Sequence, residues 1–137
     1  MTPIVVKAML IVWNGDKLLF SRGFDRVKKQ AFLRPLGGHV EVGEKGEETI
    51  RREMQEELKC DLRNVRFLSV IENLFTYQGN VGHEIILVYE GTLTDASLYK
   101  KETFTFMEGG REAEAAWFSK ADVEKENLPI YPPFIYF

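Results

Sequence analysis

The chain has a single cysteine, Cys60, and no long run of apolar residues. One cysteine excludes a disulfide within the chain and a zinc site built from several cysteines. No apolar stretch approaches the roughly 18 residues that a membrane helix needs, and the N-terminus lacks the cationic start and small-residue cleavage site of a secretory signal. We therefore expect a cytoplasmic protein that does not associate with membranes.

An excess of basic residues is also absent, since the formal net charge is −3. Proteins that bind nucleic acid usually carry a basic surface, so we expect no general nucleic-acid binding. The apolar fraction of 45% and the charged fraction of 28% are ordinary for a globular protein. A chain of 137 residues is long enough to build a hydrophobic core, and we predict one domain over residues 1–137.

The acidic residues are concentrated between Gly38 and Cys60. This segment holds seven glutamates and four basic residues, so its net charge of −3 equals that of the whole chain. Three of its carboxylates, Glu53, Glu56 and Glu57, fall within about one helical turn, where like charges four residues apart repel each other by several tenths of a kcal/mol. A bound cation relieves such repulsion, and Mg²⁺ prefers oxygen ligands. We interpret the segment as a magnesium site for phosphate chemistry.

The same segment gives the clearest helix prediction, over residues 47–59. Ile50, Met54 and Leu58 recur every four residues and form one apolar stripe. The three glutamates lie about 100° round the helix from this stripe. The helix can therefore bury the stripe and present its carboxylates at the edge of the core.

Strands are predicted on both sides of this helix, at 3–13, 17–22, 31–36, 65–77, 83–93 and 113–118. Asn14-Gly15-Asp16 predicts a type I′ hairpin turn, and Gly37-Gly38 predicts a second turn. Residues 23–30 are predicted to form a loop, and residues 94–110 a long connection with some extended structure. Ser119 is expected to cap a short helix. These elements indicate one α/β or α+β domain with a mixed sheet.

The segment from Gly38 to Cys60 resembles the Nudix box, G-x5-E-x7-R-E-U-x-E-E-x-G-U, in which U is an aliphatic residue. The fixed positions hold Gly38, Glu44, Arg52, Glu53, Glu56 and Glu57, and Met54 fills the first apolar position. Two positions depart from the pattern, because Lys59 replaces the usual glycine and Cys60 the usual aliphatic residue. The resemblance implies a Nudix-type α/β/α sandwich with a mixed sheet and a MutT-like pyrophosphohydrolase activity.

The resemblance also implies a cofactor and a set of site residues. The cofactor is Mg²⁺, with Mn²⁺ as the alternative, and the substrate is a small nucleotide or nucleotide derivative with a diphosphate linkage. The implied metal ligands are Glu53, Glu56, Glu57 and Gly38. The implied catalytic residues are Glu53, Glu56, Arg52 and Glu44, in which Arg52 orients a glutamate and Glu44 braces the loop. The implied substrate contacts are Arg34, Gly37 and Gly38.

Several alternatives stay open in the sequence. The catalytic base is Glu53, Glu56 or a glutamate of a later loop, for which the candidates are Glu84, Glu108, Glu112 and Glu114. Four aromatic side chains either stack on a nucleobase or only pack within the protein. They are Phe75, Tyr77, Tyr131 and Phe134. The specific substrate, the number of metal ions and the choice between monomer and homodimer are not decided.

Two other functions compete with hydrolysis. One is a non-catalytic nucleotide sensor of the same fold, which the retained glutamates disfavour. The other is isopentenyl diphosphate isomerisation, which relies on a cysteine, and Cys60 is poorly placed for it at the end of the helix. At Lys59, where glycine usually closes the helix in a left-handed conformation, we expect a changed helix exit rather than lost activity.

Overall fold

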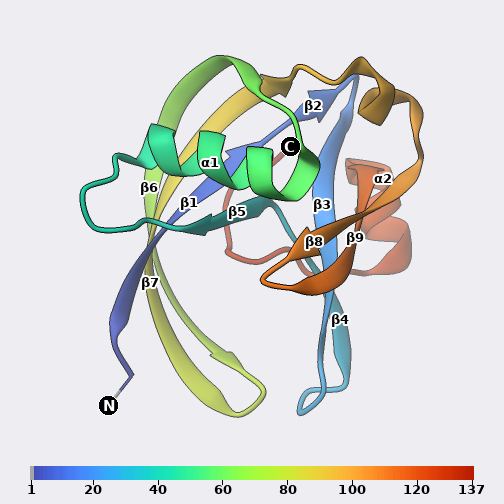
Figure 1. Cartoon of the computed structure of the whole chain (residues 1–137). Helices are drawn as coiled ribbons and strands as arrows, with labels where there is room; N and C mark the ends of the chain where they lie inside the picture. The colour runs from blue at the N-terminus through green and yellow to red at the C-terminus, as the bar shows by residue number, and fades with distance from the viewer. Residues whose placement is uncertain (1) are drawn as a thin grey trace.

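The computed structural model describes residues 2–137, which form two β-sheets between two α-helices (Figure 1). The first sheet has the order β5-β1-β7-β6. Its strands are β1 (Ile4–Ile11), β5 (Leu36–His39), β6 (Leu62–Tyr77) and β7 (Asn80–Leu93). β1 and β7 run parallel while the other pairs are antiparallel, so this sheet is mixed, as predicted.

The second sheet is antiparallel and has the order β2-β3-β9-β8, with β4 paired to β3. Its strands are β2 (Trp13–Asn14), β3 (Lys17–Asp25), β4 (Gln30–Arg34), β8 (Thr103–Glu108) and β9 (Arg111–Ser119). The helices are α1 (Gly46–Leu58), the short 3-10 helix η1 (Ala96–Lys100) and α2 (Lys120–Glu126). No helix in the described range is long and apolar enough to cross a membrane.

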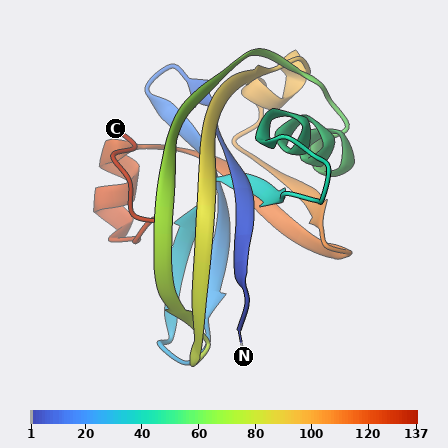
Figure 2. The same ribbon diagram turned by 90° about the vertical axis from the view of Figure 1, so that its left-hand side faces the viewer.

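The helices α1 and α2 lie on opposite sides of the strands, as Figure 2 shows. On the α1 side, the fully buried Ile50 and Met54 pack with Leu10 and Trp117. On the α2 side, a second cluster is built around the fully buried Phe20. The predicted α/β/α sandwich is therefore confirmed, with its strands divided between two sheets.

The apolar stripe predicted for residues 47–59 is the buried face of α1. Ile50, Met54 and Leu58 are all buried, which explains why this helix packs on the sheets with its glutamates at the rim. The backbone N–H of Lys45 donates to Glu48 Oε1 at 3.0 Å and satisfies one donor at the start of the helix. The predicted cap at Ser119 is also present, since Ser119 Oγ accepts from the N–H of Asp122.

Three local predictions were wrong. Gly37 and Gly38 do not form a turn but pair with Met9 and Ala8 inside β5. The predicted loop at 23–30 is shorter, because β3 continues to Asp25 and β4 begins at Gln30. The expected change of helix exit does not occur, because Lys59 keeps the left-handed conformation, with φ of 56° and ψ of 35°.

Candidate active site

Arg52 lies at the centre of the charged face of α1. Its Nε donates to Glu44 Oε2 at 2.7 Å, and its Nη1 donates to Glu53 Oε1 at 2.9 Å. Its Nη2 donates to the carbonyl oxygen of His39 at 3.1 Å, at the end of β5. One guanidinium therefore ties together the loop before α1, the helix and strand β5, which the fork of N–H donors on arginine makes possible.

Glu44 is held from two sides. Besides the bond from Arg52, Glu44 Oε1 accepts from Thr49 Oγ1 at 2.6 Å, and Thr49 is fully buried. The hydrogen bonds from Arg52 and then Thr49 lower the pKa of Glu44 to about 2. The bond to Glu44 in turn raises the pKa of Arg52, although burial opposes this effect. Both groups are therefore charged at every physiological pH.

Glu53 lies against the backbone of β5. A Cβ atom on Gly38 would fall 2.2 Å from Glu53 Cδ and 2.4 Å from Oε1. Only glycine allows the carboxylate to approach the strand so closely. The neighbouring Gly37 is as restricted, because a Cβ there would fall 2.1 Å from the carbonyl oxygen of Ala8.

Glu57 is the most unusual group of the site. The residue is 8% exposed, and its Oε2 is buried without a hydrogen-bond partner. Burial, and next the carboxylates of Glu108 and Glu53, raise the pKa of Glu57 to about 9. A buried carboxylate usually has a partner that compensates its desolvation. Within the part of the chain that the structure describes, Glu57 Oε2 has no hydrogen-bond partner that compensates its desolvation.

Two residues from the second sheet meet this face of α1. Arg34, at the end of β4, forms an ion pair with Glu108, at the end of β8. Both groups act on the pKa of Glu57, Glu108 raising it and Arg34 lowering it, which places them beside that carboxylate. Arg34 Nε is a second buried atom with no hydrogen-bond partner. Of the four later glutamates considered as bases, Glu108 is thus the one that faces Glu57.

The other predicted residues lie further out. The Glu56 side chain is 60% exposed and touches Arg52 only at 3.4 Å. Glu84 pairs with Lys7 at 2.6 Å. It lies on the α2 side of the first sheet with Ile86 and Val88, away from α1. Glu112 is exposed, and Glu114 pairs with Arg22 on the second sheet.

The four aromatic candidates contact other aromatic rings or the backbone. The ring of Phe32 packs edge-on against Tyr77 and Tyr131, with centroids 5.9 and 5.6 Å away. Phe134 packs against Tyr136. Phe75 lies across Gly82, where a Cβ would meet its ring at 2.2 Å. These side chains therefore contribute to packing in the structure described.

The carboxylates on this face of α1 are the candidate ligands for a divalent cation. Across residues 2–137, no three His, Cys, Asp or Glu side chains are gathered in the way that metal ligands are. In this arrangement Arg52 pairs with Glu53, and Arg34 pairs with Glu108. The donor set nevertheless fits Mg²⁺, since it consists of carboxylate oxygens and includes the unpartnered Oε2 of Glu57.

Sequence reasoning missed Thr49 as part of this site. Its hydroxyl was hidden among the variable positions of the motif, where threonine carries no distinctive signal. Its place one turn ahead of Arg52, next to the buried Ile50, was the available hint. The approach of Arg34 and Glu108 to one point depends on sheet pairing and cannot be read from local spacing.

A family model described as NUDIX domain matches residues 3–136. The chain belongs to the NUDIX domain family. This confirms the predicted family and the prediction of a hydrolase that acts on pyrophosphate bonds, at the level that family membership supports.

Solved structures of this family share the fold. A NUDIX hydrolase from Nitrosomonas europaea aligns with a TM-score of 0.64 at 20% identity, covering 91% of this chain and 78% of that one. A MutT NUDIX hydrolase from Burkholderia pseudomallei aligns with a TM-score of 0.61 at 21% identity, covering 88% and 86%. An ADP compounds hydrolase aligns with a TM-score of 0.61 at 16% identity, covering 92% of this chain and 63% of the other.

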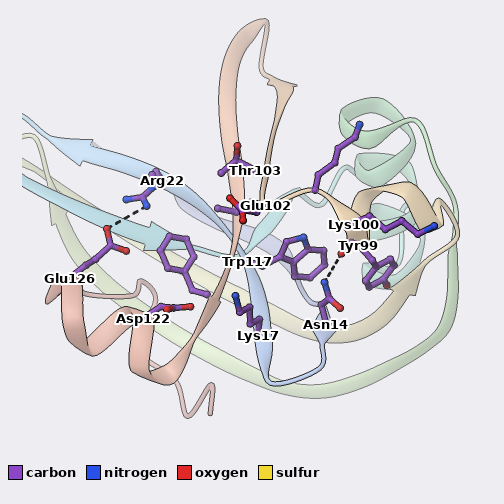
Figure 3. Close-up of a pocket in the computed structure, with 13 residues that line it drawn as sticks. Asn14, Lys17, Arg22, Tyr99, Lys100, Glu102, Thr103, Trp117, Asp122 and Glu126 are labelled. Carbon is purple, nitrogen blue, oxygen red and sulfur yellow. Dashed lines mark hydrogen bonds and ion pairs between the residues drawn. The ribbon is translucent and has the colours of Figure 1, made fainter.

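A cavity of about 360 Å³ lies elsewhere on this Nudix domain (Figure 3). It is lined from β2, β3, η1, β8, β9 and α2, by residues that include Lys17, Tyr99 and Trp117. None of the motif glutamates lines it. Within its lining, Asn14 bonds to Tyr99 and Arg22 pairs with Glu126. Because no motif glutamate lines this cavity, it is separate from the charged face of α1.

Proposed function

We propose that this Nudix protein is a Mg²⁺-dependent hydrolase that cleaves the diphosphate linkage of a nucleoside diphosphate joined to another group. Family membership supports the hydrolysis of pyrophosphate bonds. The metal and the site roles go beyond it and rest on the geometry around α1, whereas the nucleoside rests on the substrate class of the family.

The observation that carries the proposal is the state of Glu57. An ionised carboxylate that is buried, unpartnered at Oε2 and faced by two further carboxylates is unfavourable, so Glu57 binds either a proton or a cation. Among the described residues, Glu57 has no ion pair with an arginine, whereas Glu53 and Glu108 each have one. A divalent ion bound by Glu53 and Glu57 would supply the missing charge, with Glu56 as a further ligand through a modest rotation from solvent.

Glu53, Glu57 and Glu56 would hold the Mg²⁺ ion, which would supply charge neutralisation at the diphosphate and a lowered pKa of a water molecule. The chain supplies the remaining functions. Arg52 and Glu44 fix Glu53 against Gly38, whose backbone faces the same site. Arg34, whose side chain is 42% exposed, would donate from its guanidinium to a phosphate oxygen. Glu108 is the favoured base among the later glutamates, because it lies beside Glu57, and Glu53 and Glu56 remain the alternatives.

The test is a phosphate-release screen with and without Mg²⁺ or Mn²⁺. The panel covers nucleoside triphosphates, dinucleoside polyphosphates, nucleotide sugars and ADP-ribose, the last because one structural neighbour is a hydrolase of ADP compounds. A phosphatase is added wherever the product is a monophosphate. We expect metal-dependent turnover of one class, and a loss of about 100-fold or more in Glu57→Gln, because an anionic ligand is removed.

The matched control is Glu47→Gln, an exposed glutamate on the same helix whose partner is Arg51. It should keep full activity. Binding of nucleotides without turnover would favour the sensor, and conversion of a diphosphate that stays whole would favour the isomerase. Wild-type activity in Glu57→Gln would contradict the ligand assignment.

A further inference from the structure

Asp25, at the end of β3, is a buried carboxylate outside the motif. It is 4% exposed. Its Oδ1 accepts the backbone N–H groups of Val27 at 2.9 Å and Lys28 at 3.0 Å, within the turn that follows β3. Its Oδ2 accepts the N–H of Gln78 at 3.1 Å, more than fifty residues along the chain. The N–H of Lys28, and then those of Gln78 and Val27, keep the pKa of Asp25 below its ordinary value against the effect of burial.

This carboxylate joins two hairpins that belong to different sheets. The β3–β4 hairpin is part of the second sheet, and Gln78 lies in the turn of the β6–β7 hairpin of the first sheet. The two hairpin tips lie at the same end of the molecule (Figures 1 and 2). Tyr77 adds two contacts beside the bond, because its hydroxyl donates to the carbonyl of Phe24 at 3.4 Å and its ring packs on Phe32.

Each hairpin belongs to a sheet that carries part of the proposed site: Arg34 lies on β4, and Glu53 lies against β5 of the first sheet. β4 ends at Arg34, and Pro35 alone separates it from the start of β5 at Leu36. The first sheet carries β5, against which Glu53 lies, and part of the core under α1. The distance between Arg34 and the glutamates of α1 therefore depends on how the β3–β4 hairpin is held against the first sheet.

We propose that Asp25 is a positioning residue, which clasps the two hairpins and so fixes Arg34 at the distance from the α1 glutamates that a bound diphosphate requires. The clasp acts at the far end of β4, so its effect reaches substrate through Arg34. This inference rests on the proposed function, in which Arg34 contacts the diphosphate.

Asp25→Asn separates the clasp from the local turn. The amide oxygen of asparagine can keep the two bonds from Val27 and Lys28. The amide nitrogen then takes the place of Oδ2, where it cannot accept from Gln78. The matched control is Asp95→Asn, because Asp95 Oδ1 also accepts two bonds in a turn, but both come from Ser97 beside it.

A disulfide can replace the clasp without restoring the carboxylate. A Cβ on Gly79 would lie 3.9 Å from Val27 Cγ2, so the two tips are in van der Waals contact at this point, and a cysteine at Gly79 would hold the positive φ of 81° at some cost in strain. Val27→Cys with Gly79→Cys in the Asp25→Asn background would join the same two tips. The one native thiol, Cys60, is buried, and a reducing agent opens the bond in the same molecule.

We expect Asp25→Asn to raise KM for the diphosphate substrate about 3- to 10-fold and to change kcat by less than about twofold. Oxidation of the double-cysteine variant should bring KM back toward the wild-type value, and reduction should raise it again. Asp95→Asn should leave KM unchanged. An unchanged KM in Asp25→Asn, a fall in kcat without a rise in KM, or no rescue by oxidation would each overturn the inference.

A measurement without substrate separates this inference from the proposed function. The Nε–H signal of Arg34 in NMR spectra of the ligand-free protein should broaden or shift in Asp25→Asn and recover with the disulfide. The amide of Gln78 should exchange faster with solvent in the same variant. If the Arg34 signal changes in Asp25→Asn but the protein hydrolyses no substrate, the proposed function is wrong and the role of Asp25 stands. If the Arg34 signal is the same in Asp25→Asn and in the wild type, the proposed role of Asp25 is wrong, even in an active enzyme.

Discussion

The Cβ atom that Gly38 lacks would lie 2.2 Å from Cδ of Glu53. Gly38 of strand β5 and the side chain of Glu53, a proposed metal ligand on helix α1, are therefore in close contact. The obstructed atoms are the far end of a flexible side chain, so a larger residue would move the carboxylate rather than the backbone. Glycine at this position therefore controls where Glu53 lies more than how stable the protein is.

Gly38→Ala should lower metal-dependent turnover by about tenfold or more, because the displaced Glu53 loses its place beside Glu57. The free energy of unfolding should fall by no more than about 1 kcal/mol. Turnover at saturating Mg²⁺ and urea unfolding measure the two effects. Gly91→Ala is the control, since its nearest contacts would be at an ordinary 3.5 Å, and it should match the wild type in turnover.

The stability of the metal-free protein should depend on pH through Glu57. Its pKa is raised from 4.5 to about 9 on folding, so the folded state binds the proton more tightly than the unfolded state. The contribution to stability is complete below about pH 4.5 and is lost as the pH rises toward 9. Glu57→Gln cannot lose a proton, so its advantage over the wild type should grow with pH.

Urea unfolding in the presence of a chelator, at pH 5, 7 and 8.5 or thereabouts, measures this difference. From the lowest to the highest of these pH values, the free energy of unfolding of Glu57→Gln should rise relative to that of the wild type by at least about 1 kcal/mol. Saturating Mg²⁺ should stabilise the wild type more than the variant and more at high pH. A difference that stays constant with pH would contradict the assignment of Glu57 as a buried, unrelieved carboxylate.

Adjacent arginines on α1 should have very different importance. Arg52 binds Glu44, Glu53 and the carbonyl of His39, and its removal leaves the partly buried Glu44 and Glu53 uncompensated. Arg52→Ala should therefore cost about 2–3 kcal/mol of stability and at least tenfold in turnover. Arg51 is more exposed and pairs with Glu47 and Asp61. Arg51→Ala should cost no more than about 1 kcal/mol and leave turnover intact.

Arg52→Lys completes this comparison. Lysine keeps the charge but not the fork that reaches the helix, the loop and β5 together. If the charge alone mattered, Arg52→Lys would behave as the wild type. We expect it to lie closer to Arg52→Ala, as judged by urea unfolding and by initial rates.

The α1 side of the site could be predicted because its residues are local in sequence. The spacing of Ile50, Met54 and Leu58 determines which face of the helix is buried, and the position of the glutamates follows from it. The family and the α/β/α fold followed from the same segment, and the mixed sheet followed from it and from the pattern of strands around it. The division into two sheets did not, because the pairing of distant strands leaves no trace in local periodicity.

The contributions of Arg34, Glu108 and Asp25 show the limit of such reasoning. Arg34 and Glu108 meet only because β4 and β8 flank β3 and β9 in one sheet. Asp25 was placed in a loop, because a strand that ends in a buried aspartate looks like a polar break. The two glycines alone predict a turn at Gly37-Gly38, whereas the close approach of Ala8 and Glu53 is what requires both glycines.

Lys59 provides a test of helix termination that is independent of catalysis. It holds a left-handed conformation that costs a residue with a Cβ about 1 kcal/mol or more relative to glycine. Its N–H still donates to the carbonyl of Gln55 at 3.2 Å, and its Nζ donates to the carbonyl of Glu56 at 2.9 Å. The side-chain bond is exposed to solvent and recovers only part of the backbone cost.

Lys59→Gly should therefore raise the free energy of unfolding by about 0.5–1 kcal/mol, because glycine adopts this conformation without the steric penalty. Lys59→Ala loses the same side-chain bond and keeps the strain, so it should be no more stable than the wild type. Urea unfolding at one pH compares the three proteins. Turnover should be equal in all of them, since the proposed ligands precede residue 59. Equal stability of the glycine and alanine variants would show that the chain leaves α1 by a relaxed conformation and that the lysine bears no strain.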